Sequence, residues 1–412
     1  MWVGLDQIAT GQFGATRRRL RGARVGVLTH AAATDRRGYS CLETLDELGV
    51  HPRVVFGPEH GLDGALQAQE AVPTPDAEGD DWTQRFVSLY GSSKESLTPT
   101  PEQLEGLDLL LIDLCDVGSR YYTYVWTALL AARAASALGI HTLILDRPNP
   151  ISGDPQRAEG ALQAEGFLSF VGLEPLPIRH CLTLGEIVAH FLHQGGAELG
   201  PDGALSIVPT RGWERLQTAR AWGRPFVPPS PNMPSLETAL VYPGGCLLEG
   251  TNLSEGRGTT LPFLTVGAPF LDGEALARAL RDAALPGVVV RPTSFKPSFD
   301  KFAGELCRGV MLHVTDERLF RPVSTYLTLI TLAQRQAPEQ FQFSTEAYEF
   351  ERETPAFDLL TGSTAAREAI LAGESPSQVC ERVAPQAVLS AEGAPWADAV
   401  TAIEALAQRA SA

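Results

Sequence analysis

Two titratable side chains, Glu59 and His60, stand next to each other in the sequence, two residues after the strand-like run at 53–56. Burying an unpaired charge in a hydrophobic core is costly, so this pair suits the edge of a fold better than its interior. In open α/β sheets, ligand sites lie beyond the carboxyl ends of the strands. Glu59 and His60 are therefore the first candidates for acid–base chemistry, with a solvated turn as the alternative.

A second polar peptide, at residues 249–260, contains Glu249, Asn252, Glu255 and Arg257 among three glycines. Backbone N–H groups of a glycine-rich loop, together with a guanidinium, can converge on an anionic or polyhydroxylated ligand. The two carboxylates can also take part in proton transfer. The peptide therefore predicts a binding loop, although an irregular connecting loop is the alternative.

The stretch 113–124 combines carboxylates, an arginine and three tyrosines, and it follows another apolar run. Tyrosine rings suit the apolar faces of sugars, and their hydroxyl groups suit the polar edges. We therefore expect Tyr121 and Tyr124 to contact a saccharide, with Asp116 and Arg120 as polar neighbours. Alternatively, at least one of the tyrosines packs only against the helix that follows.

Three more polar residues lie in loops that can reach the same region. Asn149 belongs to the peptide 146–150, in which an Asp-Arg pair can equally serve as a structural staple. His180 precedes a predicted helix, and a lone histidine is more often structural. Asn232 lies in the proline-rich segment 225–234, at a predicted domain seam where ligand pockets are common. All three are candidate substrate-binding residues.

The elements that must position these residues alternate between short apolar strands and helices. Up to residue 208, the predicted strands are 25–29, 53–56, 107–114, 142–145 and 206–208, and the predicted helices are 122–138 and 183–193. Further along the chain, strands are predicted at 288–291 and 310–314, and helices at 273–284 and 323–336. Thr183 and Glu186 form a capping-box pattern at the start of the second helix. Buried strands joined by helical crossovers predict an α/β fold with a Rossmann-like layered parallel sheet.

At 412 residues the chain exceeds what one hydrophobic core usually supports, so we expect two domains. Prolines concentrate at residues 225–234, where they exclude a regular helix or a central strand. We place the boundary there. The prediction is a Rossmann-like catalytic domain at 1–228, a smaller α+β C-terminal domain at 229–362 and a helical C-terminal extension at 363–412.

The composition argues against several functional classes. With 33 basic and 49 acidic residues, the net charge of −16 disfavours nucleic acid as a partner. No apolar run approaches the ~18 residues needed to cross a bilayer, so we expect no membrane span. Six widely spaced cysteines and no signal-peptide pattern favour the cytoplasm. No G-x-G-x-x-G, Walker A or HExxH motif occurs, so we expect neither a cofactor nor a metal.

Six peptides together identify a family. FGPEHG, DVGSRYYTY, DRPNP, PSPNMP, YPGGCLLEGTN and SEGRGTTLPF occur in this order, and in them the chain resembles the exo-β-N-acetylmuramidase (NamZ-like) family over most of its length. The resemblance implies an exo-acting glycosidase that releases N-acetylmuramic acid from the non-reducing ends of peptidoglycan fragments. It also implies that Glu59, which matches the glutamate of the PEHG peptide, is catalytic and lies in an interdomain cleft.

Glycoside cleavage needs a proton donor at the leaving oxygen and a second group, a carboxylate or the acetamido group of the substrate, that stabilises the reacting centre. We expect Glu59 to be the general acid. The candidates for the second role are His60, Asp116, Glu249 and Glu255. The lactyl carboxylate of muramic acid can pair with Arg257 or Arg120. Two other interpretations stay open. One is a non-catalytic protein that binds muropeptides or sugars, and the other is a metal-dependent hydrolase that uses His60, His180 and the pair Asp113 and Asp116.

Overall fold

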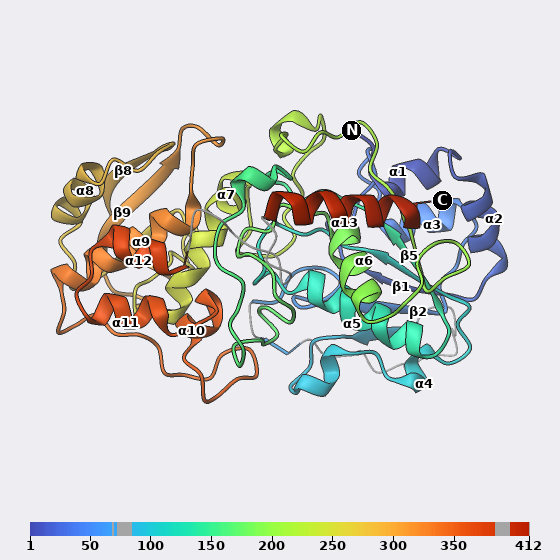
Figure 1. Ribbon diagram of the computed structural model, residues 1–412, viewed down its shortest axis with the longest axis horizontal. Coiled ribbons are helices and arrows are strands. Elements are labelled where there is room, and N and C mark those ends of the chain that lie inside the picture. The colour runs from blue at the N-terminus through green and yellow to red at the C-terminus, as the bar shows by residue number, and fades with distance from the viewer. Residues whose placement is uncertain (68–69, 72–84, 384–395, 412) are drawn as a thin grey trace.

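The computed structural model describes residues 1–67, 70–71, 85–383 and 396–411. Two parts lie side by side in Figure 1: a larger N-terminal part around a six-stranded sheet and a smaller C-terminal part around a three-stranded sheet. This arrangement confirms the predicted α/β fold with a smaller second domain. None of the helices in the described part of the chain is long and apolar enough to span a bilayer.

The larger sheet is parallel, with the strand order β3-β2-β1-β4-β5-β6, the order of a Rossmann-like sheet. Its strands are β1 (Val25–Thr29), β2 (Val54–Gly57), β3 (Arg85–Ser88), β4 (Leu109–Asp113), β5 (His141–Leu145) and β6 (Leu205–Val208). The register pairs Leu28 with Ile112 across β1 and β4. Because all six strands run the same way, the loops after β1, β2, β4 and β5 meet at one edge.

Helices cover both faces of this sheet, since successive residues of each strand point to opposite sides. The helices are α1 (Gly4–Ala9), α2 (Gly14–Gly22), α3 (Cys41–Glu47), α4 (Pro101–Leu104), α5 (Tyr124–Ala137) and α6 (Leu184–Gln194). Val25 and Val27 pack with α1, α2 and α3, whereas Leu28 packs with α5 and α6. At the start of α6, Thr183 and Glu186 form the predicted capping box.

The C-terminal part places helices against an antiparallel sheet of order β7-β9-β8. Its elements are α7 (Leu236–Gly245), β7 (Thr265–Ala268), α8 (Gly273–Asp282), β8 (Val288–Phe295), β9 (Cys307–Val314), α9 (Pro322–Gln336), α10 (Ala356–Thr361), α11 (Ala365–Leu371) and α12 (Pro376–Val383). The segment 249–263, which contains the glycine-rich peptide, leads into β7. The C-terminal part therefore presents this peptide to the neighbouring parallel sheet.

The last helix, α13 (Trp396–Ala410), returns to the N-terminal part, where it packs against α6 and crosses it in the view of Figure 1. The indole Nε1 of Trp396 donates a hydrogen bond to the carbonyl oxygen of His180 at 3.0 Å. The predicted C-terminal extension at 363–412 thus contains α11 and α12, which lie with the C-terminal part, and α13, which does not. Its residues 384–395 lie outside the described part of the chain.

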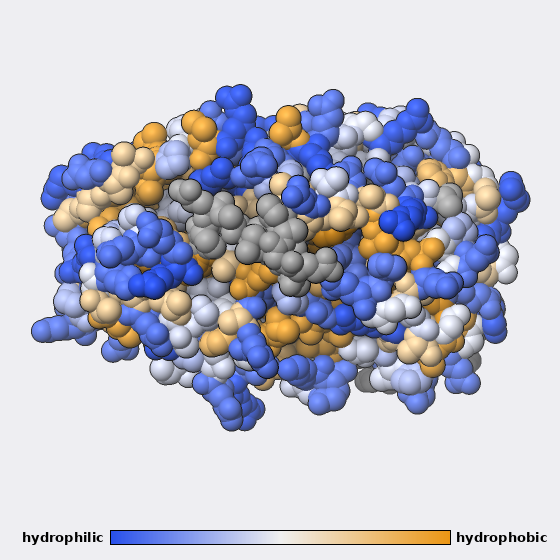
Figure 2. Space-filling view, viewed as in Figure 1, coloured by the Kyte–Doolittle hydropathy of each residue, from blue (hydrophilic) through white to orange (hydrophobic). Residues whose placement is uncertain are grey.

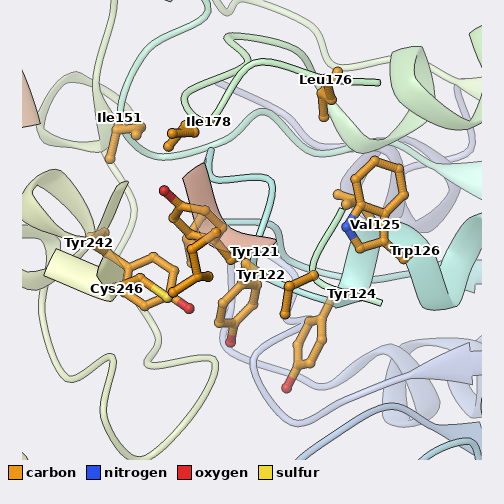
Figure 3. Packing of buried hydrophobic residues seen from close by; sticks show 14 of the residues in the cluster. Tyr121, Tyr122, Tyr124, Val125, Trp126, Ile151, Leu176, Ile178, Tyr242 and Cys246 are labelled. Atoms are coloured by element: carbon orange, nitrogen blue, oxygen red, sulfur yellow. The ribbon is translucent and has the colours of Figure 1, made fainter. Parts of the chain in front are cut away.

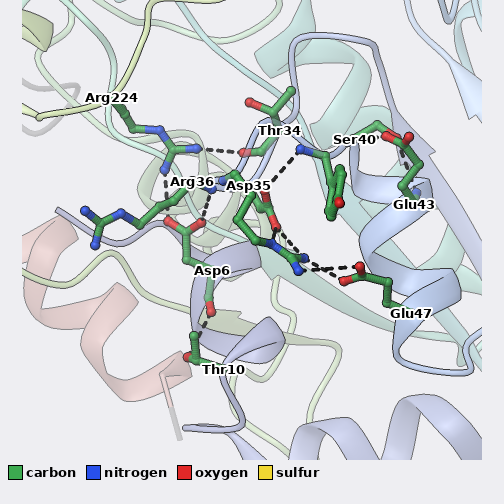
Figure 4. A network of polar contacts seen from close by, with 11 residues as sticks. Asp6, Thr10, Thr34, Asp35, Arg36, Ser40, Glu43, Glu47 and Arg224 are labelled. Carbon is green, nitrogen blue, oxygen red and sulfur yellow. Dashed lines mark hydrogen bonds and ion pairs between the residues drawn. The ribbon is translucent and has the colours of Figure 1, made fainter.

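Polar contacts tie the N-terminus to the loop after β1 and to the segment before the proline-rich peptide (Figure 4). Asp6 accepts hydrogen bonds from the backbone N–H of Arg36 at 2.7 Å and from Arg224 Nη1 at 2.9 Å. Arg224 also donates to the carbonyl oxygen of Thr34. These contacts fix one end of the peptide 225–234. The face seen in Figure 2 carries hydrophilic side chains interspersed with smaller groups of apolar ones.

Candidate active site

Two adjoining cavities lie between the two parts of the molecule, and we call them together the cleft. The wide cavity has a volume of about 390 Å³. The narrow cavity has about 30 Å³, which is room for water molecules but not for a sugar ring. Three residues line both cavities: Glu249, Arg257 and Tyr348. The narrow cavity is also lined by Glu59, His60, Tyr121, Tyr122, Thr123, Asn232 and Glu349.

Glu59 follows β2 at the carboxyl edge of the parallel sheet, and it is only 6% exposed. The hydroxyl group of Thr123 donates a hydrogen bond to Glu59 Oε2 at 2.7 Å. The hydroxyl group of Tyr124 lies 3.0 Å from the backbone carbonyl oxygen of Glu59. Because Thr123 and Tyr124 begin α5, the start of this helix orients both the side chain and the backbone of Glu59.

His60 lies beside Glu59 and lines the same narrow cavity. Its φ of +70° is in the left-handed region, which non-glycine residues rarely adopt. Its Nδ1 atom lies 2.8 Å from the carbonyl oxygen of Leu66, so the loop after β2 orients the ring. The sharp turn at His60 lets two consecutive side chains, Glu59 and His60, reach the cleft together.

The glycine-rich peptide contributes a network of charges around Arg257. Arg257 Nη2 donates to Glu249 Oε1 at 2.6 Å, and Arg257 Nε lies 3.2 Å from Glu255 Oε1. Lys301 Nζ donates to Glu255 Oε2 at 3.0 Å, and Tyr348 donates to Glu249 Oε2 at 2.6 Å. All four carboxylate oxygens of Glu249 and Glu255 therefore have partners. Although burial alone would raise it, Lys301 and Arg257 hold the pKa of Glu255 below its usual value.

Tyrosine rings form one wall of the cleft, and Figure 3 shows the side chains of Tyr121, Tyr122 and Tyr242 close to one another. Tyr121 and Tyr122 line the narrow cavity and pack edge to face on Tyr242, with ring centroids 6.4 and 6.1 Å away. The hydroxyl group of Tyr121 donates to the carbonyl oxygen of Pro243 at 3.1 Å. Burial raises the pKa of all three phenols, so they stay neutral. Tyr124 packs beneath this wall, with its hydroxyl group at the backbone of Glu59.

Asn232 joins the proline-rich segment to the loop after β2. Its Nδ2 atom donates to Gln67 Oε1 at 2.7 Å, and Asn232 lines the narrow cavity. Gln67 lines the wide cavity. The segment 225–234 therefore forms part of the cleft wall, and the division of domains at residue 228 remains a prediction.

Asp116 and His180 lie at a different cavity or away from the cleft. Asp116 lines a separate cavity of about 60 Å³ near the loops after β1 and β4. Its Oδ2 atom accepts from the backbone N–H of Gly118 at 2.8 Å and lies 3.3 Å from His180 Nε2. His180 is fully buried. The structure does not bring these two side chains to Glu59.

Arg120, Asn149 and Asn252 are engaged with the backbone. The Arg120 guanidinium is buried and donates to three backbone carbonyl oxygens and to Gln163. Asn149 donates to the carbonyl oxygen of Leu182 at 2.9 Å and accepts from a backbone N–H two residues on. Asn252 holds the segment at 340–342 through two hydrogen bonds to the main chain. These three side chains position loops, and none of them lines the cleft.

Residues with metal-binding side chains do not cluster in the part of the chain that the structure describes: no group of three or more His, Cys, Asp and Glu side chains could hold a metal ion there. The residues of the metal-dependent interpretation are separated. His60 lines the cleft, His180 lies at Asp116, and Asp113 forms a buried ion pair with Arg147.

The structure adds cleft residues that the motifs did not indicate. Glu349 and Tyr348 come from the segment after α9, and Thr123 begins α5. Tyr90, after β3, donates a hydrogen bond to Glu349 at 2.9 Å. Thr123 stood inside a candidate motif, so its position could have been noted. Glu349 lay in no polar peptide that drew attention, because its neighbours at 347–350 include Ala, Tyr and Phe.

Comparison with known proteins agrees with the fold and the peptides. The family model described as exo-beta-N-acetylmuramidase NamZ, N-terminal, matches residues 25–237, and the corresponding C-terminal model matches residues 240–388. The chain is 40% identical over 368 residues to the peptidoglycan beta-N-acetylmuramidase NamZ of Bacillus subtilis (strain 168). This match covers 88% of the chain and 83% of that protein.

Two solved structures from Bacteroides fragilis, both described as DUF1343 family proteins, share the architecture. One has a TM-score of 0.80 at 28% identity and covers 99% of this chain and 97% of its own. The other has a TM-score of 0.69 at 25% identity and covers 100% and 98%. Because the two family models together span most of the sequence, this chain belongs to the exo-β-N-acetylmuramidase NamZ family.

Proposed function

We propose that this protein is an exo-acting glycoside hydrolase that releases N-acetylmuramic acid from the non-reducing ends of peptidoglycan fragments, with Glu59 as general acid. Membership of the NamZ family supports the reaction. The single observation that carries the assignment of the acid is the position of Glu59. It is a buried carboxyl group, oriented by Thr123, in a cleft that the charged peptide of the other part also lines.

The cleft suits an amino sugar bearing a carboxylate. Tyr121 and Tyr122 offer aromatic surface to a sugar ring. Arg257 lines both cavities and is our proposed partner of the lactyl carboxylate, because its charge lies at the cleft, whereas Arg120 is enclosed by backbone carbonyl groups. Asn232 adds an amide to the lining of the narrow cavity.

The test is the turnover of a disaccharide with N-acetylmuramic acid at its non-reducing end. We expect Glu59→Gln to lower kcat by about 10²–10⁴-fold, the usual contribution of a general acid. Glu105→Gln, the same change at an exposed glutamate, is the matched control. Near wild-type turnover by Glu59→Gln would contradict the assignment of the acid. Calorimetric binding of the disaccharide by wild-type protein without released sugar would instead support the sugar-binding interpretation.

The cytoplasm is the proposed place of action. All six cysteines are free in the structure, and two of them, Cys115 and Cys380, are partly exposed. Free thiols persist in reducing compartments and are rare in oxidising ones. After cell fractionation, activity in the cytoplasmic fraction would support this proposal, and activity outside that fraction would contradict it.

A further inference from the structure

The cleft contains a second buried carboxyl group, that of Glu349. Its side chain lines the narrow cavity together with Glu59, and the residue is 8% exposed. The two glutamates come from different parts of the molecule: Glu59 follows β2, and Glu349 lies between α9 and α10. The cleft therefore brings together two carboxyl groups that are 290 positions apart in the sequence, as their residue numbers show.

The backbone at Glu349 is unusual. Tyr348 and Glu351 exchange two backbone hydrogen bonds, of 2.8 and 2.9 Å, so Glu349 and Phe350 are the central residues of a tight turn. Both have positive φ values, +45° and +70°. Turns with two such residues favour Asn-Gly, and a non-glycine residue in this region costs on the order of 1–3 kcal/mol. Strain of this kind persists only where the surroundings hold it.

The N-terminal part holds this turn in place. The Phe350 ring packs on Tyr90 and Phe170, with centroids 5.6 and 6.3 Å away. Lys94 Nζ lies 2.9 Å from Glu351 Oε1. Through these contacts the strained turn directs Glu349 into the cleft rather than toward solvent.

Glu349 has one oxygen held and one available. Tyr90 donates to Oε2 at 2.9 Å, while Oε1 accepts no hydrogen bond within the described part of the chain. By contrast, both oxygens of Glu249 and both oxygens of Glu255 are already bonded or paired. Among the carboxyl groups of the cleft, Glu349 thus has an oxygen that can accept a hydrogen bond from a water molecule.

The charges that face Glu349 oppose its ionisation. Burial and the negative charge of Glu59 raise its pKa well above the usual value, and the charge of Glu249 adds to this. The hydrogen bond from Tyr90 and the charge of Arg257 act in the opposite direction. A raised pKa makes the ionised form of Glu349 a stronger base than an exposed carboxylate.

We propose that Glu349 is the second catalytic carboxyl group, which receives the proton of the attacking water, and that Tyr90 is its positioning residue. This inference rests on the proposed function. In the step, the bond between the anomeric carbon and the leaving oxygen breaks, and its electron pair stays on that oxygen, which takes the proton of Glu59. Water forms the new bond to the anomeric carbon, and its proton passes to the carboxylate of Glu349. Glu59 ends the step as a carboxylate and Glu349 as a carboxylic acid, and one water has been consumed; exchange of one proton with solvent restores both groups.

Two substrates separate the roles of the two glutamates. A disaccharide with terminal N-acetylmuramic acid has a poor leaving group that needs a proton, whereas 4-nitrophenyl β-N-acetylmuramide has a leaving group that departs without one. We expect Glu59→Gln to lose at least 100-fold on the disaccharide but less than about tenfold on the nitrophenyl substrate. We expect Glu349→Gln to lose at least 100-fold on both, because water must still be deprotonated.

Controls distinguish catalysis from folding. Glutamine at 349 can still accept the Tyr90 hydrogen bond, so we expect Glu349→Gln to unfold at the temperature of the wild type. Glu353→Gln makes the same change at an exposed residue of the same segment and should leave both rates unchanged. In Glu349→Ala, azide should restore turnover of the nitrophenyl substrate by acting as the nucleophile in place of water. A structural role for Glu349 would give no such rescue.

The Tyr90→Phe variant tests the positioning role of Tyr90 through the pH dependence of kcat/KM. Since the hydrogen bond from Tyr90 lowers the pKa of Glu349, its removal should shift the acid limb of kcat/KM to higher pH. An unchanged profile would overturn the positioning role. Rates of Glu349→Gln within threefold of wild type on both substrates, or loss on the disaccharide alone, would overturn the catalytic role. If wild-type protein hydrolyses neither substrate, the proposed function itself fails.

Discussion

The buried imidazole of His30 should make the folded state sensitive to acid. His30 follows β1, is 2% exposed, and its Nε2 atom accepts a hydrogen bond from the backbone N–H of Cys115 at 3.0 Å. Burial, the positive charge of Arg147 and the proximity of His60 lower the pKa of His30 from 6.5 to about 3. The folded protein therefore keeps this ring neutral at pH values where the unfolded chain protonates it.

The difference between the two pKa values sets the direction and the size of the change in stability with pH. For a lowered pKa, the stabilisation is present above the unfolded value of 6.5 and is lost as the pH falls toward about 3. The loss approaches about 1.4 kcal/mol per pH unit, which gives about 2 kcal/mol between pH 7 and pH 5. Asp146 and Glu186 act in the opposite direction over the same range, because burial raises their pKa values to about 6 and 7. Because wild type and a His30 variant share Asp146 and Glu186, the contribution of these two groups cancels when the two proteins are compared.

The assay is urea unfolding of wild type and His30→Gln at pH 7 and pH 5. Glutamine can keep the acceptor for Cys115 but cannot take up the proton. Between pH 7 and pH 5, the free energy of unfolding of the variant should fall by about 2 kcal/mol less than that of wild type, whatever the stability of the variant at pH 7. His51→Gln, at an exposed histidine, should behave as wild type. Equal losses in wild type and His30→Gln would refute the argument that burial keeps this ring neutral.

Two further predictions concern stability. Ala284, just after α8, has a φ of +51°, so Ala284→Gly should raise the free energy of unfolding in urea by about 1 kcal/mol. Ala283→Gly, at a φ of −70°, should lower it, and stabilisation by both variants would contradict the argument from the backbone angle. Arg147→Met should cost about 3–5 kcal/mol because it leaves Asp113 buried without its partner, and adding Asp113→Leu should recover most of the loss. A double variant no more stable than Arg147→Met would show that the pair is not the cause.

The parallel sheet could be predicted because most of its strands are continuous apolar runs. Residues 25–29 match β1 as predicted, and α5 and α6 lie within about a turn of their expected ends. The strands β3 and β7 were not predicted. Their sequences, Arg-Phe-Val-Ser and Thr-Val-Gly-Ala, are short and carry too few apolar residues to stand out from loops.

The sequence indicated peptides that lie at the cleft, but it did not show which side chains within those peptides line it. Arg120 and Asn149 belong to polar peptides at the correct edge, but in the fold their side chains satisfy buried carbonyl groups. Sequence alone does not distinguish a polar group that binds a ligand from one that supports a loop. Glu349 was not predicted as a cleft residue for a different reason. Its turn contains Glu-Phe in place of the usual Asn-Gly, so the sequence gives no turn signal there, and the turn forms because tertiary contacts override the local preference.

The return of α13 to the N-terminal part limits how the cleft can widen. A sugar ring needs more room than the narrow cavity offers, so its walls must separate when substrate arrives. In the sequence α13 follows the helices of the C-terminal part, but it is anchored on the N-terminal part by Trp396 and by the ion pair of Arg215 with Glu404. A movement that separates Glu349 from Glu59 must therefore either leave α13 in place on α6 or break these contacts.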